Sequence, residues 1–182
     1  MRHIKFIRSI LLIISTVLIT SCSNNSAMKP EDFKNKEPRL IIEEYLTGNV
    51  KAWGVLQNRS GKVTRQFSAD LNGSWDGKQL ILKEKFNWDD GEIQNREWTI
   101  NKIDENNYEG TAGDVVGKAK GFSYGPAFKF EYVLLVPVKG KEMKITFDDW
   151  IFKQDDKVAI NRATMTKFGF KVAELTVVFV KD

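Results

Sequence analysis

The feature that most constrains the fold is a long run of short segments in which polar and apolar residues alternate. Such alternation is typical of β-strands with one buried face. Short sequences rich in Gly, Asn and Asp separate the segments, and these residues supply the positive φ angles of tight hairpin turns. The pattern predicts about ten strands, over 51–57, 63–71, 79–88, 93–104, 108–111, 118–124, 127–138, 142–153, 157–168 and 170–180.

The connections between these strands are short, which favours hairpins between successive strands over wide crossovers. A series of hairpins builds an antiparallel up-and-down sheet. Closing that sheet into a barrel removes its two exposed edges. We therefore expect an all-β fold, an antiparallel up-and-down barrel of about ten strands, within residues 39–182.

A short helix is predicted ahead of the barrel. Ile41 and Tyr45 are four residues apart, so they share one face of a helix, and Gly48 can end that helix. A first strand fits the same residues, because the run 40–46 is too short for its period to decide.

The N-terminus has the pattern of a bacterial lipoprotein signal peptide. Arg2, Lys5 and Arg8 make it basic, and residues 10–19 are mostly apolar but too few to span a bilayer. Two small residues then precede Cys22, the only cysteine of the chain. We expect cleavage before this cysteine and its acylation. The alternatives are an ordinary secretory signal and an uncleaved anchor.

Cleavage there divides the chain into three parts. They are the signal peptide 1–21, the lipidated cysteine with a flexible polar tether 22–38, and the barrel domain 39–182. The acyl anchor makes a membrane the expected partner. In enteric bacteria an Asp after the cysteine favours retention in the inner membrane, and Ser23 lacks that signal. We expect the periplasmic face of the outer membrane.

Charge and residue types exclude several kinds of site. The chain has 28 Lys and Arg against 24 Asp and Glu, and three of these basic residues lie in the signal peptide. The remainder is nearly neutral, so no electrostatic footprint for nucleic acid remains. The single histidine, His3, is also in the signal peptide. With Cys22 acylated, a Ser-His-Asp triad, a Cys-His pair and Cys/His zinc sites are excluded from the barrel. No catalytic residue, metal or cofactor is predicted.

Five charged residues interrupt the apolar phases of their predicted strands. Each shares a strand face with apolar neighbours, as Arg96 does with Trp98, so each is expected to point into the barrel. A charge on an inner face needs a partner, because desolvating it alone costs several kcal/mol. The five residues are Arg65, Glu84, Arg96, Asp149 and Arg162.

These charges have structural and functional interpretations. They can pair in an internal network, or some can lie in water at the barrel mouth. In the functional interpretation one arginine lacks an acid and binds the carboxylate or phosphate of a ligand, while Trp98 and other aromatic side chains line the apolar part of the pocket. Glu84 or Asp149 can also act as a general acid or base if burial shifts its pKa. An enzyme is therefore the less favoured alternative.

Four stretches of the barrel sequence carry a family resemblance. They are Phe147-Asp148-Asp149-Trp150, residues 161–169, Asp89-Asp90-Gly91-Glu92 followed by Arg96-Glu97-Trp98, and residues 110–119. Together they resemble the DUF3833 family of bacterial lipoproteins, a domain of unknown function, over nearly the whole chain after Cys22. The resemblance implies a lipocalin-like barrel on a lipid anchor and favours a lipid-like ligand. It implies no established catalytic residues.

We therefore expect a membrane-anchored periplasmic lipoprotein whose barrel binds an amphipathic, anionic ligand similar to a fatty acid or lipid. The main alternative is a scaffold or assembly lipoprotein whose barrel is filled by its own side chains. A sizeable empty lumen reached by the charged residues favours binding or catalysis, whereas a filled lumen favours the scaffold.

Overall fold

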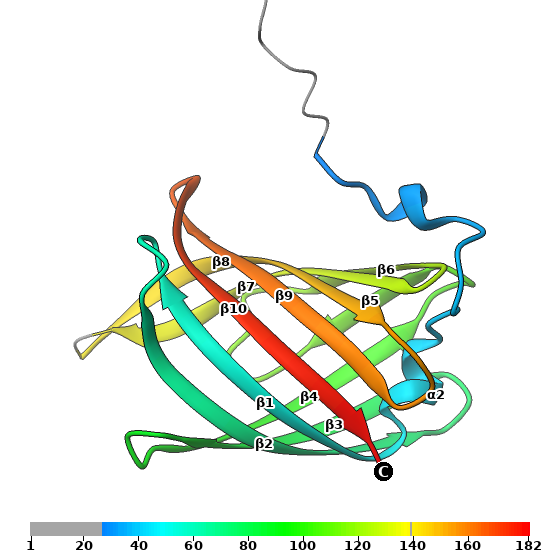
Figure 1. The fold of residues 1–182 in the computed structure, drawn as a ribbon, viewed down its shortest axis with the longest axis horizontal. Coiled ribbons are helices and arrows are strands. Elements are labelled where there is room, and N and C mark those ends of the chain that lie inside the picture. The colour runs from blue at the N-terminus through cyan, green and yellow to red at the C-terminus, as the bar shows by residue number, and fades with distance from the viewer. Residues whose placement is uncertain (1–26, 139) are drawn as a thin grey trace, which may run out of the picture.

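The computed structural model of the protein describes residues 27–138 and 140–182. Within them, ten antiparallel strands form a closed barrel in which successive strands pair and β1 pairs with β10 (Figure 1). The strands are β1 (Gly48–Asn58), β2 (Val63–Trp75), β3 (Gln79–Trp88), β4 (Ile93–Lys102), β5 (Asn107–Thr111), β6 (Ala119–Tyr124), β7 (Ala127–Val138), β8 (Lys141–Lys153), β9 (Val158–Lys167) and β10 (Phe170–Lys181). The predicted up-and-down barrel is confirmed, whereas Cys22 and the signal peptide lie outside the described residues.

Two short helices, η1 (Pro30–Phe33) and α2 (Ile42–Leu46), precede the strands, and α2 closes one end of the barrel. Ile42 is fully buried, and a side chain at Gly73 of β2 would collide with the carbonyl oxygen of Leu46. A helix of five residues is not stable alone, so packing at the end of the barrel holds α2 in place. The predicted helix is confirmed. Neither described helix is long and apolar enough to span a bilayer.

The last strand is tied to this helix. The ammonium group of Lys181 donates hydrogen bonds to the backbone carbonyls of Glu44, Tyr45 and Thr47 at 2.6, 3.0 and 2.8 Å. These are carbonyls of the kind that the C-terminus of a helix leaves unpaired. The Tyr45 hydroxyl donates to the carbonyl of Lys157, in the β8–β9 turn, at 2.9 Å. The barrel is therefore closed at the end where β10 finishes and the β8–β9 turn lies.

A buried carboxylate completes this closed end. Glu43 accepts hydrogen bonds from the Tyr108 hydroxyl at 2.9 Å and from the Lys102 ammonium at 2.5 Å. Burial raises the pKa of Glu43, but the hydrogen bonds from Lys102 and Tyr108 outweigh burial, so this pKa lies below its usual value. Glu43 is therefore held ionised and paired where α2 meets β4 and β5.

One part of the wall is completed by a loop. β5 and β6 are short, with five and six residues, whereas β7 has twelve. The connection between β5 and β6 runs beside the uncovered part of β7, where Val116 N–H donates to Val133 and Leu135 N–H donates to Asp114, at 2.8 and 2.9 Å. This loop carries Asp114 into the wall between β4 and β7.

Part of the segment expected as a tether, residues 30–33, contacts the barrel. η1 packs on the outer face of the barrel, where the ring of Phe33 lies 5.9 Å from that of Trp150 and 5.5 Å from that of Phe152. A side chain at Gly125 would collide with the carbonyl oxygen of Phe33. The apolar ring of Phe33 thus attaches the last part of the tether to the barrel wall.

Buried residues alternate along most strands, and Trp98 and Phe147 are both buried, as predicted. Phe147 packs with Leu134, Ile145 and Ala163 and stacks on Tyr132 with ring centroids 5.0 Å apart. This cluster lies toward the open end, away from α2.

We expect Phe147→Ala to lower the free energy of unfolding by roughly 3–5 kcal/mol, because it removes a buried aromatic ring and leaves a cavity. Denaturant unfolding measures this change. The control is Phe170→Ala, whose side chain is exposed and whose loss should cost less than about 0.5 kcal/mol. Equal effects of the two substitutions would contradict the inward position of Phe147.

Candidate functional site

The barrel encloses a cavity of about 860 Å³. It extends from Ile42 and Leu46 of the closing helix to Arg65 and Trp88 near the opposite end. Most of its lining is apolar, and Trp98 stands in it with ring contacts to Phe130 and Tyr132 at 5.1 and 5.3 Å between centroids. A mostly apolar cavity with a few polar groups is the usual form of a small-molecule site, and this volume lies in the usual range.

Polar groups meet in the wall of this cavity around Arg96. The Nε and Nη2 atoms of Arg96 donate hydrogen bonds to one carboxylate oxygen of Asp114 at 3.0 and 2.8 Å. On the other side of Arg96, Nη1 lies 3.8 Å from the Oε2 atom of Glu84, its partner in the β3–β4 register. Arg96 is therefore shared between two carboxyl groups, with Asp114 the closer.

Glu84 is the least satisfied member of this group. Its Oε2 atom is buried and has no hydrogen-bond partner among the described residues. Burial raises the pKa of Glu84 to about 7, with Arg96 opposing the rise and Asp149 adding to it. Glu84 therefore changes its charge near neutral pH and can offer a ligand either a hydrogen-bond acceptor or a donor.

Asp149 is buried in the same cavity but is better satisfied. The Tyr132 hydroxyl donates to its Oδ2 atom at 2.8 Å, and the Asn161 amide donates to its Oδ1 atom. Burial raises the pKa of Asp149, although the bonds from Asn161 and Tyr132 act in the opposite direction. The neighbouring Asp148 points to the outer face, where it lies 3.5 Å from Lys129, as expected for adjacent residues of a strand.

Arg65 lies near the open end of the cavity and is already paired. Its Nη2 atom donates to Asp90 at 2.7 Å and to Glu92 at 2.9 Å, both near the β3–β4 turn. Its guanidinium group also lies 4.0 Å from the ring centre of Trp88. Arg65 therefore lies at the barrel mouth, which the sequence allowed for some of these charges, and not among the deep polar groups.

The predicted inward position of Arg162 is wrong. Its side chain is 63% exposed on the outer face, where it lies 3.4 Å from Glu174. In β9 the buried residues are Ala159, Asn161 and Ala163, which are small or polar, whereas larger apolar residues lie in the other phase. The more apolar phase of this strand contains Arg162, so assigning that phase to the interior placed the wrong face of β9 inside the barrel.

Three interior polar residues were missed as site residues. Tyr132 lies on an alternating aromatic stripe of β7 that is typical of a barrel wall, Asn161 lies on the phase of β9 opposite to that of Arg162, and Asp114 lies in a glycine-rich loop without alternation. Only Tyr132 carried a sequence signal of its position, the aromatic alternation of β7. In the described parts of the chain the deep site holds three carboxyl groups, those of Glu84, Asp114 and Asp149, and one guanidinium group. These parts contain no group of carboxylates suited to a metal ion.

Solved structures with this fold come from proteins with little sequence similarity. An S-type phycobiliprotein lyase, CPES, from Guillardia theta is 10% identical with a TM-score of 0.58, over 77% of this chain and 90% of that one. A protein of unknown function from the DUF3598 family of Nostoc punctiforme is 15% identical with a TM-score of 0.60 over 81% of this chain, which spans 51% of its length. These likenesses establish a lipocalin-like fold and no more.

A search of curated protein sequences gives no match. The family model described as "Protein of unknown function (DUF3833)" matches residues 16–181, which includes the whole barrel and confirms the resemblance carried by the sequence motifs. The chain belongs to the DUF3833 family.

Proposed function

We propose that this protein is a lipid-anchored binding protein of the cell envelope, whose barrel holds a small lipid-like molecule with one polar end. The observation that carries the proposal is the apolar cavity of about 860 Å³ with, in its wall, a buried Glu84 oxygen that accepts no hydrogen bond from the described residues. A barrel that served only as a scaffold gains nothing from an open lumen, because filling it would add packing contacts. The likeness to a phycobiliprotein lyase supports the fold and not this chemistry.

The charge balance of the cavity bears on the polar end of the ligand. Arg162 lies outside, Arg65 is paired at the mouth, and Arg96 is held by Asp114. Within the described interior no arginine is thus left over for an anionic group, which weakens the carboxylate or phosphate ligand expected from the sequence. A hydroxyl or amino group that donates a hydrogen bond to Glu84 suits these residues better, because it satisfies the unpaired acceptor.

The anchor and its location complete the proposal. Cys22 follows a basic and apolar segment with small residues before the cysteine, and Ser23 follows it. Acylation at this position attaches the barrel to a membrane, and we place it on the periplasmic face of the outer membrane. Two or more acyl chains attach a protein stably to a membrane, whereas a single chain gives only marginal membrane binding.

Native mass spectrometry of the full-length protein from its own host should detect a non-covalent small molecule, which organic extraction releases. We expect Glu84→Leu to lower its occupancy roughly fivefold to a hundredfold, since an unmade buried hydrogen bond costs about 1–3 kcal/mol. The matched control is Glu131→Leu on the outer face of β7, which should keep the molecule. A wild-type barrel that carries nothing, or equal losses in both variants, would contradict the proposal.

The raised pKa of Glu84 predicts a pH dependence of stability. The pKa is about 7 in the barrel against 4.5 for an unperturbed Glu, so the folded state holds this proton more tightly than the unfolded state. The resulting stability is fully present below pH 4.5 and is lost as the pH rises to about 7. The free energy of unfolding of Glu84→Gln, relative to that of the wild type, should therefore rise by about 3 kcal/mol between pH 4.5 and pH 8. Denaturant unfolding at several pH values measures this gain, and a constant difference would show that Glu84 does not titrate in this range.

Cys22→Ser tests the anchor. Metabolic labelling with an acyl probe should mark the wild type and not the variant. The melting temperature of the barrel should be unchanged, because its core residues lie between Leu40 and Val177. An unlabelled wild type would disprove the lipoprotein proposal and leave the cavity proposal standing.

A further inference from the structure

Two phenylalanine side chains project into solvent at the β9–β10 turn. Phe168 is 89% exposed and Phe170 is 72% exposed, which makes them the most exposed large apolar side chains in the described chain. The turn lies at the end of the barrel opposite α2, the end toward which the cavity opens. Single exposed apolar residues are common on protein surfaces, but two aromatic rings exposed together at one turn form an apolar patch, and such patches mark interaction sites.

The backbone of this turn adds a second observation. Phe168 and Gly169 have φ angles of +52° and +81°, the left-handed region required at both positions of a tight two-residue hairpin. Asn or Gly is the usual choice for the first position, whereas a bulky side chain there costs about 1–2 kcal/mol. A turn that only connected two strands would be more stable with a small polar residue. The stability of the turn therefore does not explain why this position holds Phe168.

Most charges around this turn are basic, although Lys171 is paired with Glu174 of β10 at 2.8 Å. Lys167 and Lys171 flank the two rings, and the Lys167 ammonium lies 5.2 Å from the ring centre of Phe168. The adjacent β1–β2 hairpin adds Arg59 and Lys62, both exposed. Neither hairpin turn contains an acidic residue. Aromatic rings surrounded by basic side chains suit the interface of an anionic bilayer, where rings enter the headgroup region and ammonium groups meet phosphates.

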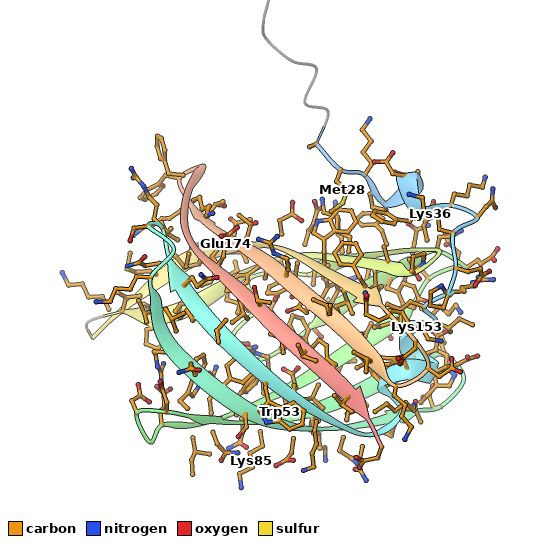
Figure 2. All side chains as sticks on the ribbon, in the orientation of Figure 1. Met28, Lys36, Trp53, Lys85, Lys153 and Glu174 are labelled. Atoms are coloured by element: carbon orange, nitrogen blue, oxygen red, sulfur yellow. The ribbon has the colours of Figure 1, made fainter. Side chains whose placement is uncertain are left out.

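The β3–β4 turn at the same end of the barrel has the opposite character. It contains Asp89, Asp90 and Glu92 and would be repelled by an anionic surface. In Figure 1 this turn lies at the lower edge of the barrel, whereas the β9–β10 turn rises at the upper edge. Figure 2 shows Lys85 of β3 at the lower edge and Met28, near the start of the described chain, at the upper edge. The basic turn and the start of the described chain thus share one side of the molecule.

This arrangement agrees with the anchor of the proposed function, on which the inference partly rests. Lys29 is seven residues after Cys22, so the connecting chain reaches at most about 25 Å. An acylated Cys22 therefore keeps the side with the β9–β10 turn close to the bilayer.

We propose that the β9–β10 turn docks into an anionic lipid surface, with Phe168 and Phe170 in the headgroup region and Lys167, together with Arg59 and Lys62 of the β1–β2 hairpin, against phosphates. The acidic β3–β4 turn then faces away from the bilayer. Docking places the open end of the cavity at the membrane surface, where a lipid-like molecule can pass between bilayer and barrel without crossing bulk water.

The test places a fluorescent reporter at the turn of the full-length protein. Wild type, Phe168→Trp and Phe170→Trp are reconstituted into phosphatidylglycerol-containing vesicles with or without brominated acyl chains, which quench tryptophans that reach the bilayer. We expect the emission added by either substitution to be shifted to the blue and mostly quenched. Vesicles of neutral lipid should weaken the quenching, because each basic residue near an anionic surface contributes roughly a fivefold increase in binding.

The matched control is Ile93→Trp, which puts the same reporter at an exposed position beside the acidic turn. Its added emission should not be quenched. Unquenched emission from both substitutions at the β9–β10 turn, as expected if that turn meets a protein instead, would overturn the docking proposal, as would equal quenching of the Ile93→Trp reporter. Acyl-probe labelling of the wild type reports separately on the anchor. Labelling without quenching rejects docking alone, and quenching of an unlabelled protein rejects the anchor alone.

Discussion

The pairing of β1 with β10 is the interaction on which the rest of the structure depends. Its register runs from Val50 opposite Lys181 to Asn58 opposite Ala173. Without it the sheet would have two exposed edges, and the interior side chains would lie on one face of an open surface. With it the sheet encloses a cavity, and the end of β10 comes beside α2. Barrel closure, the closed end and the cavity are therefore consequences of one strand ladder.

The polar groups inside the barrel work against its stability. Desolvating a carboxyl group costs several kcal/mol unless hydrogen bonds or an ion pair offset the loss. Hydrogen bonds from Tyr132 and Asn161 offset the burial of Asp149, and those from Arg96 offset the burial of Asp114. Glu84 has Trp98 and Arg96 beside it, but Arg96 is 3.8 Å from its Oε2 atom, which has no hydrogen-bond partner among the described residues. Under the proposed function, the bound molecule would supply the hydrogen bond that this oxygen lacks.

Strand positions followed from the sequence because turns and alternation are local properties. The same alternation placed Glu84, Arg96 and Asp149 on the inner face correctly. It failed for Arg162 because β9 carries Val158 and Ile160 on the outer face and small residues at most inner positions, so hydrophobicity alone assigned the wrong side. Asp114 escaped prediction for another reason: it reaches the site from a loop that fills a gap beside β7, and that gap exists only because β5 and β6 are short. The pairing of Arg96 with Asp114 thus depends on how β4, this loop and β7 come together, which the local sequence does not show.

The position of the closing ladder also has a consequence for how the chain folds. The two strands that meet in it are the first and the last of the barrel, separated by more than a hundred residues. Contacts between residues so far apart in sequence form slowly, because a long loop must be ordered before they add stability. Each hairpin can form as the chain emerges, but none of them encloses an interior. During synthesis or export the sheet therefore keeps two open edges until β10 is present, and a partly emerged chain is more exposed to aggregation or chaperone binding than the finished barrel.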